Sequence, residues 1–185
     1  PVQREKAAAA IEAERVDYPR PEFNLEPVNE VMTVTLHSSP DSGWKQLKGF
    51  LQGPVGHLSA TIFEFGANYI KDALIGACGD NGTMHFVMQY KADANVWDNK
   101  DAADELKQGL GNRLKFAWAP VVMTKATTEG WFPSAYHEKV IVKDHRHLWL
   151  SSGNWKSSNQ PEEDPFNPPA GFDEAAFLRD HNREY

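Results

Sequence analysis

The chain has 185 residues, of which 41% are hydrophobic and 24% are charged, a composition typical of one globular domain with a sizeable core. Its formal net charge of -7 argues against a dedicated nucleic-acid-binding protein, because phosphate contacts usually require an excess of Lys and Arg. Its single cysteine excludes an intrachain disulfide and a cysteine-based metal cage. No stretch approaches the roughly 18 apolar residues of a transmembrane segment. We therefore expect a soluble protein, and the sequence leaves a bacterial-type cytoplasmic and an exported location open.

The first 30 residues are predicted to lie outside the main domain. Residues 3–15 are rich in Ala and Glu and indicate a helix. The Pro-rich segment 17–27 predicts an extended linker. We therefore expect an N-terminal helix and linker over residues 1–30, followed by a domain over residues 31–185.

The domain alternates between apolar, β-branched runs and segments with helical spacing. The runs predict strands over residues 31–37, 58–65, 83–90 and 114–122. The helical patterns cover residues 44–51, 67–78, 98–110 and, near the end, 173–180. Asp41 is the expected N-cap of the first helix in this domain. This order predicts an α/β fold, with a mixed β-sheet and helices on both faces.

Two further predicted strands carry a group of polar residues. The first strand is HEKVIVK, residues 137–143, and the second is HLWLSSGN, residues 147–154. The connection between them, Asp-His-Arg-His, is short enough for an antiparallel hairpin. Residues two apart in a strand share a face, so His137 and Lys139 are expected to project together.

The register of this hairpin decides which side chains meet. With the loop centred directly after His145, His137 lies opposite Asn154 and Lys139 lies opposite Ser152. Directly opposed residues point to the same face and lie about 5 Å apart. The sequence therefore predicts that these four polar side chains converge on one patch, and a shift of one residue would separate them.

The residue types in this patch suit displacement at phosphorus. The neutral imidazole of His137 is a nucleophile at physiological pH, and Lys139 supplies a positive charge for an anionic group. Ser152 and Asn154 donate hydrogen bonds to oxygens that develop charge. Asp144, at the strand end, is expected to orient the hairpin or a neighbouring group. This chemistry requires neither a metal ion nor another cofactor, and we predict none.

The segment HEKVIVKD, followed by SSGNW, resembles the His-Lys-Asp signature of the phospholipase D superfamily. The family pattern continues with Gly-Ser-x-Asn after six intervening residues. In this chain Ser151 takes the Gly position, whereas Ser152 and Asn154 match. The alternating α/β order also fits the family module, so the resemblance covers residues 31–185.

The resemblance implies a phosphodiesterase that forms a covalent phosphohistidine on His137. The group bound there is then hydrolysed by water or transferred to an alcohol. It implies that Lys139 and Asn154 bind phosphate oxygens and that Ser152 makes a weaker contact. Family members also orient the histidine with a glutamate in an Asn-x-Glu stretch, and Glu184 in HNREY is the candidate. Because the chain is acidic, we expect a phospholipid substrate. A nuclease of the same chemistry and a non-catalytic binding or structural relative are the alternatives.

The signature occurs once, because no other histidine in the chain is followed by Lys two residues later. The family site uses two histidines, one as nucleophile and one as general acid, so this chain is expected to supply half a site. The other half would come from a symmetric copy of the chain or from a C-terminal fragment of the same enzyme. We expect the second arrangement, because the chain ends just after Glu184, where the family module would continue into another strand.

Overall fold

The computed structural model describes residues 27, 29–89, 98–119 and 137–180. The chain divides into two compact units, one of residues 37–121 and 133–185 and the other of residues 1–36 and 122–132. Every helix and strand described below lies in the first unit. The predicted N-terminal helix over residues 3–15 and the predicted site residue Glu184 lie outside the described residues.

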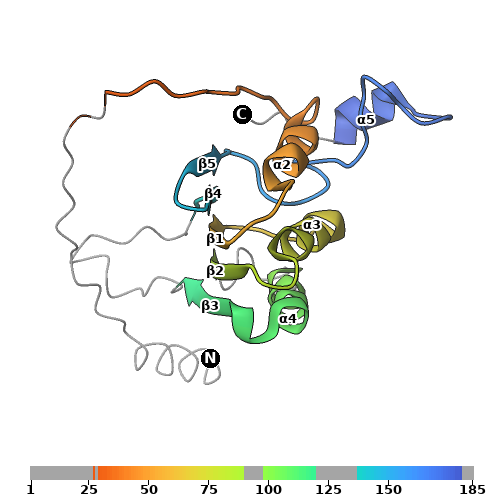
Figure 1. Ribbon diagram of the computed structural model, residues 1–185. Helices are drawn as coiled ribbons and strands as arrows, with labels where there is room; N and C mark the ends of the chain where they lie inside the picture. Colours follow the sequence, from red (N-terminus) through yellow and green to blue (C-terminus); the bar gives the residue numbers. More distant parts are fainter. Residues whose placement is uncertain (1–26, 28, 90–97, 120–136, 181–185) are drawn as a thin grey trace, which may run out of the picture. The chain divides into compact units, whose positions relative to one another are not determined.

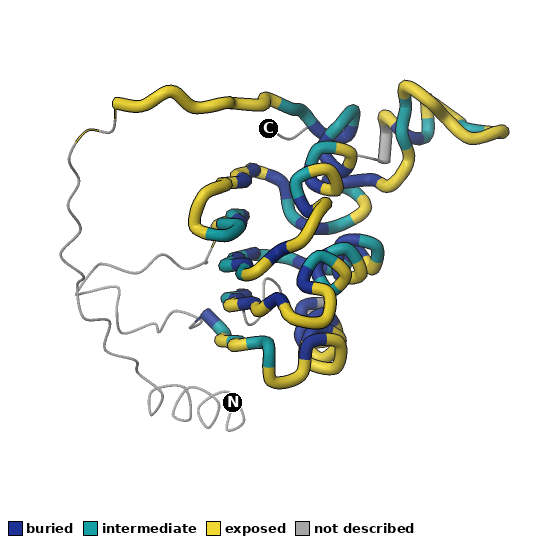
Figure 2. Tube along the Cα trace, in the orientation of Figure 1, coloured by how far each residue is buried: buried dark blue, intermediate teal, exposed yellow. Residues whose placement is uncertain are grey.

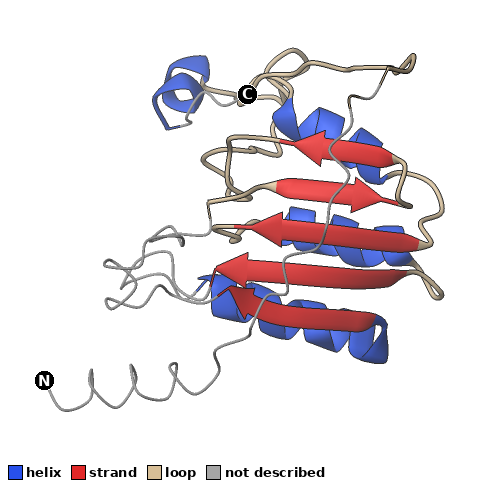
Figure 3. Ribbon diagram, turned by 90° about the vertical axis from the view of Figure 1, so that its left-hand side faces the viewer, coloured by secondary structure: helices blue, strands red, loops and turns tan. Residues whose placement is uncertain are grey.

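Five strands form one mixed sheet in the order β3-β2-β1-β4-β5 (Figures 1 and 3). The strands β1 (His57–Ile62), β2 (Thr83–Gln89) and β3 (Leu114–Ala119) run parallel to one another. The strand β4 (Val140–Lys143) runs antiparallel to β1, and β5 (His147–Leu150) runs antiparallel to β4. The predicted mixed α/β sheet is therefore confirmed.

The helices α2 (Gly43–Leu51), α3 (Asn68–Cys78) and α4 (Asp98–Leu110) lie against one face of the sheet (Figures 1 and 3). The helices α3 and α4 form the crossovers between successive parallel strands, as parallel pairing requires. A short helix, α5 (Glu174–Asp180), follows the polar segment after β5. The described residues thus provide a helical layer on one of the two faces that we predicted to be covered. None of the described helices is long and apolar enough to cross a membrane.

Side-chain alternation along the strands directs one set of residues beneath this helical layer. In β1, Leu58, Ala60 and Ile62 are buried, whereas the residues between them are half-buried. Figure 2 shows buried positions on the strands and on the helix surfaces that face them. The helices contribute the buried side chains of Leu47, Leu51, Ile70, Leu74, Leu106 and Leu110. Burying each such side chain stabilises the fold by about 1.5–3 kcal/mol, so this layer is the core of the unit.

Residues 31–37 form no strand, so that prediction is wrong. Val31, Val34 and Leu36 are 104%, 67% and 89% exposed. Strand propensity expresses how well a residue fits a pleated, half-buried surface with neighbours on both sides. These residues are rich in β-branched side chains, but they belong to none of the strands of the described sheet.

The other predicted helices and strands of residues 44–180 are confirmed, and the ends of all but α4 are shifted. The predicted linker over residues 17–27 lies, except for residue 27, outside the described residues. The strand β5 ends at Leu150, four residues before its predicted end, and the N-cap of α2 is Ser42 rather than Asp41. Residue 90 of one predicted strand and residues 120–122 of another lie outside the described residues. Local periodicity predicts the type of an element, whereas its ends depend on tertiary contacts.

A buried asparagine holds the carboxyl end of β1. Asn99, in the first turn of α4, is fully buried, and its Oδ1 accepts a hydrogen bond from the Phe65 N–H at 2.8 Å. Its Nδ2 donates to the carbonyl oxygens of Phe63 and Gln89, both at 2.8 Å. Buried backbone groups require hydrogen-bond partners. Asn99 is the partner of three such groups at the ends of β1 and β2.

Asn99→Ala should destabilise the protein by about 2–5 kcal/mol, because it leaves three backbone groups without their partner. Lys100→Ala is the matched control, since Lys100 is the next residue of α4, its side chain is 62% exposed and its ion pair with Asp104 lies on the surface. Urea unfolding followed by circular dichroism measures both variants. Equal unfolding midpoints for Asn99→Ala and the wild type would contradict a stabilising role for these hydrogen bonds.

Candidate functional site

The predicted register of the β4–β5 hairpin places four residues, Asp-His-Arg-His, between the paired positions, but the observed loop has three. It contains residues 144–146, because Lys143 pairs with His147. Its first two residues adopt positive φ angles of 52° and 55°, a left-handed conformation that Asp and His tolerate better than most residues. These two residues reverse the chain within three positions. The predicted pairing of Lys139 with Ser152 is therefore wrong by one residue.

The observed register changes how the predicted site residues meet. Regular pairing ends at Leu150, and beyond it the Ser151 N–H donates to the Lys139 carbonyl at 3.1 Å. Ser152 is exposed, and the chain bends there. This bend, rather than cross-strand pairing, brings Asn154 back toward the end of β1.

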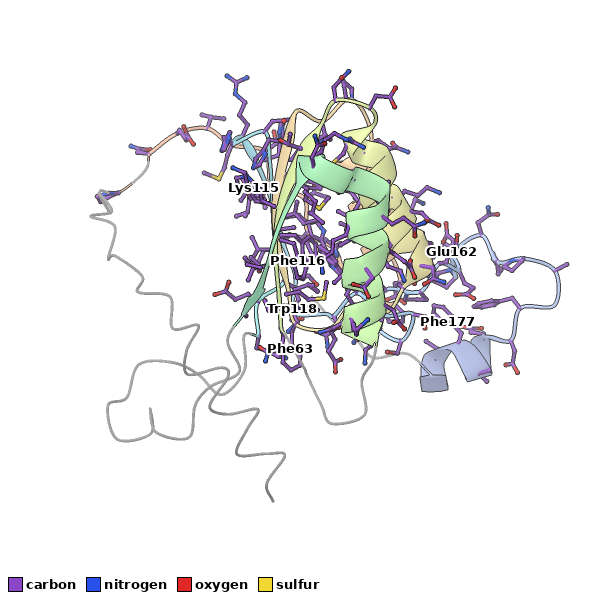
Figure 4. The ribbon with its side chains drawn as sticks, turned by 90° about the horizontal axis from the view of Figure 1, so that it is seen from below. Phe63, Lys115, Phe116, Trp118, Glu162 and Phe177 are labelled. Atoms are coloured by element: carbon purple, nitrogen blue, oxygen red, sulfur yellow. The ribbon has the colours of Figure 1, made fainter. Side chains whose placement is uncertain are left out.

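His137 and Lys139 lie at the carboxyl end of β1. Because β4 is antiparallel to β1, with Thr61 opposite Val140, the residues that precede β4 lie beside those that follow β1. The ring of Phe63 lies 4.7 Å from the His137 ring and 5.3 Å from Lys139 Nζ. Figure 4 shows Phe63 at this end of the sheet. Ligands of open α/β sheets bind outside the carboxyl ends of the strands, so this edge is the candidate site.

The two residues of the signature differ in exposure. His137 is exposed, whereas Lys139 is only 2% exposed. The Lys139 ammonium donates to the His137 carbonyl at 3.4 Å and lies over the Phe63 ring. Charges attract more strongly where water is excluded. The site therefore presents an accessible imidazole next to a cation that is shielded from solvent.

Asn154 contacts Glu64, the residue that follows Phe63. Asn154 Nδ2 donates to Glu64 Oε2 at 2.8 Å. Lys156 Nζ lies 3.0 Å from the same oxygen. No pattern in the sequence indicates Glu64 or Lys156 as site residues, because neither belongs to a motif and the contact joins segments about 90 residues apart.

Trp155 fixes the direction of its two neighbours. It is fully buried, and its N–H donates to the Glu64 carbonyl at 3.0 Å. Its own carbonyl accepts hydrogen bonds from the N–H groups of residues 66–67, both at 2.9 Å. Alternate residues of an extended segment point in opposite directions. Burial of Trp155 therefore turns Asn154 and Lys156 together toward Glu64.

Ser151, which stands where the Gly-Ser-x-Asn pattern has glycine, makes a hydrogen bond within its own segment. Ser151 is buried, and its Oγ accepts a hydrogen bond from the Gly153 N–H at 3.0 Å. Serine side chains stabilise tight turns in this way. Ser151 thus supports the bend between β5 and Asn154. The orienting role of Glu184 stays a prediction, because that residue lies outside the described part of the chain.

Asp144 lies at the far end of the hairpin from His137. Its Oδ1 accepts hydrogen bonds from the His57 N–H at 2.8 Å and the Gly56 N–H at 2.9 Å. These bonds, the His57 bond first, hold the pKa of the Asp144 carboxyl below its ordinary value. Strand β4 separates Asp144 from Lys139 by about 16 Å. Asp144 therefore fastens the hairpin to the start of β1.

Three histidines gather near Asp144 and form what we term the histidine cluster: His57, His85 and His145. The His57 ring lies 4.5 Å from that of His85 and 5.4 Å from that of His145. Its two nitrogens contact the hydroxyls of Thr83 and Ser59 at 2.9 and 3.0 Å. Burial, followed by the neighbouring histidines, lowers the pKa of His57. Among the described residues, no group of three metal-binding side chains is arranged to hold a metal ion.

The fold is similar to that of solved structures. No protein-family model matches the chain, and a search of curated proteins found no match. The chain is similar to the phospholipase D family member Nuc from Salmonella typhimurium, with 14% identity and a TM-score of 0.55 over 68% of this chain and 74% of that chain. NucT from Helicobacter pylori shows 15% identity and a TM-score of 0.53 over 68% and 76% of the two chains. The chain therefore has the phospholipase D-like α/β fold that the signature predicted.

Asp144→Ala should lower the thermal unfolding midpoint near pH 7, and this difference from the wild type should shrink on acidification. The pKa of folded Asp144 lies below its ordinary value of 3.8, so its carboxylate stabilises the fold above that value. This stabilisation is lost as the pH falls through the folded-state pKa. Thermal unfolding by circular dichroism across this pH range measures the effect. A difference that stays constant from neutral to acidic pH would contradict it.

Proposed function

We propose that this chain forms one half of a phosphodiesterase site in which His137 is the nucleophile. The observation that supports this most strongly is the convergence of His137, Lys139 and Asn154 around the Phe63–Glu64 segment at the carboxyl end of β1. His137 and Lys139 belong to the His-Lys-Asp signature, and Asn154 belongs to the Gly-Ser-x-Asn pattern that follows it. Similarity to the fold of a phospholipase D family member supports the same assignment.

The proposed reaction has two displacements at phosphorus. In the first, a nitrogen of His137 attacks, a P–N bond forms and the P–O bond to the leaving alcohol breaks. A general acid protonates the leaving oxygen. Lys139 and an N–H of Asn154 stabilise the negative charge on the other phosphate oxygens. In the second displacement, water or an alcohol attacks phosphorus, gives up its proton, and the P–N bond breaks to restore His137.

The general acid is proposed to come from a second half-site. Among the described histidines, the histidine cluster and His147 lie at the other end of the sheet, and His37 stacks on Trp149 at 6.0 Å. His137 therefore has no described histidine beside it to act as the acid. Either a symmetric copy of the chain or a C-terminal fragment of the same enzyme would supply it.

Phospholipid is the proposed substrate. Leu148 and Leu150 of β5 are 65% and 64% exposed, and Leu150 lies two residues before the bend at Ser152 that leads to Asn154. An exposed apolar surface beside an anion-binding group suits a molecule with both acyl chains and a phosphodiester. The net charge of -7 also disfavours a polyanionic substrate. Nucleic acid is the alternative substrate for the same chemistry.

Parallel assays on phosphatidylcholine vesicles and single-stranded DNA test this proposal. The complete enzyme should release choline, and His137→Ala should reduce the rate by at least about 10³-fold and abolish acid-labile phosphoenzyme. His85→Ala, in the histidine cluster, is the matched control and should retain activity. Turnover of DNA but not of phosphatidylcholine would mean that nucleic acid, rather than phospholipid, is the substrate. Unchanged turnover in His137→Ala would refute the mechanism, and inactivity on both substrates would favour a binding role.

The mass of the active assembly identifies the source of the second half-site. Under denaturing conditions a symmetric copy should give one species of 20.8 kDa, the mass of this chain. A fragment of the same enzyme should instead give a second polypeptide of different mass. Native mass spectrometry of the same sample gives the stoichiometry. An active species that contains a single copy of this chain and nothing else would contradict the half-site proposal.

A further inference from the structure

We propose that Glu64 positions Asn154 and that Lys156 is the counter-ion that makes this arrangement compatible with a bound phosphodiester. This inference rests on the proposed function, because it takes Asn154 to be a ligand of the phosphate oxygens. Glu64 and Lys156 lie outside the His-Lys-Asp signature. They would act through Asn154, so we describe them as positioning residues.

The Glu64 carboxylate determines the orientation of the Asn154 amide. An ionised carboxylate only accepts hydrogen bonds, so the amide nitrogen and not the amide oxygen must face Glu64 Oε2 at 2.8 Å. The nitrogen retains a second N–H that can donate to a phosphate oxygen. Asn154 Oδ1 is buried and has no hydrogen-bond partner in the described part of the chain. Glu64 thus opposes a rotation of the amide that would point its oxygen, an acceptor, at the phosphate.

Glu64 is held on both sides by backbone hydrogen bonds. Asn99 binds the carbonyl of the preceding residue, Phe63, and the N–H of the following residue, Phe65. The Glu64 carbonyl itself accepts from the N–H of Trp155, whose side chain is fully buried. A side chain that orients a ligand-binding group must have a fixed backbone. Glu64 meets this requirement.

Lys156 offsets the negative charge that Glu64 places beside Asn154. A carboxylate next to Asn154 would repel an anionic phosphodiester, and the repulsion is strong where water is scarce. The Glu64 and Lys156 side chains are only 17% and 26% exposed, and their charges lie 3.0 Å apart. By contrast, the Lys100–Asp104 pair on α4 is 62% and 53% exposed. Lys156 therefore neutralises a partly buried charge, whereas Lys100 lies in a solvent-screened surface pair.

A double-mutant cycle tests the counter-ion role of Lys156. Lys156→Met should raise KM for the phosphodiester about tenfold and change kcat by less than about threefold, because it leaves Glu64 uncompensated. Glu64→Gln introduced with Lys156→Met should restore KM to within about threefold of the Glu64→Gln value, since a neutral amide needs no counter-ion. Lys100→Met is the matched control and should leave KM unchanged. A double variant as impaired as Lys156→Met would overturn the counter-ion role, because Lys156 would then act on the phosphate itself.

A comparison of two Glu64 variants tests the positioning of Asn154. Glu64→Ala removes the acceptor and should lower kcat by about 10- to 100-fold, whereas Glu64→Gln keeps an acceptor and should lower it less. The ¹⁵N-labelled side-chain amide of Asn154 gives a readout that does not depend on turnover. Its NMR resonances should shift in Glu64→Ala and shift less in Glu64→Gln, while the dispersed backbone amides report that each variant is folded.

The two readouts separate this inference from the proposed function. Unchanged Asn154 resonances in folded Glu64→Ala would overturn the positioning role, whether or not the enzyme cleaves phosphodiesters. Resonances that shift as expected in an assembly without phosphodiesterase activity would uphold the positioning of Asn154 and refute the proposed function. Titration with inorganic phosphate should perturb the same Asn154 resonances in the wild type. It should do so less in Lys156→Met at equal phosphate concentration, and an equal response would overturn the counter-ion role.

Discussion

The candidate site depends on one buried side-chain amide, that of Asn99, which accepts one hydrogen bond and donates two. Each of these bonds is 2.8 Å long, and together they satisfy backbone groups of Phe63, Phe65 and Gln89 where two parallel strands end. Without them the chain would have to satisfy these buried groups by other means or leave them unpaired. Because Asn99 holds it, the Phe63–Glu64 segment is a fixed turn rather than a continuation of β1.

Besides Asn99, residues from two other parts of the chain contact this turn. Phe63 lies against His137 and Lys139, which precede β4, and Glu64 binds Asn154, which follows β5. Trp155 joins the site to the core, because its ring is buried there while its backbone hydrogen-bonds the turn. The packing that stabilises the fold therefore also sets the geometry of the site.

The spacing of the signature has a structural explanation. The four residues between Lys139 and Asp144 are the four residues of β4, Val140–Lys143. One end of this strand carries the exposed imidazole and the buried ammonium. The other end carries a carboxylate that binds two backbone N–H groups at the start of β1. The motif thus combines groups suited to phosphate chemistry with an anchor that keeps the short strand in place.

The sequence by itself determined the type and order of most elements and identified the signature, because local periodicity and residue chemistry need no knowledge of distant contacts. It predicted a strand over residues 31–37 that the structure lacks, since a strand requires a paired neighbour. The hairpin register depends on the left-handed backbone of Asp144 and His145. The hydrophobic periodicity of the flanking strands carries no information on these loop angles. Only the tertiary structure revealed Glu64 beside Asn154, because residues 90 positions apart meet only when the whole core has packed.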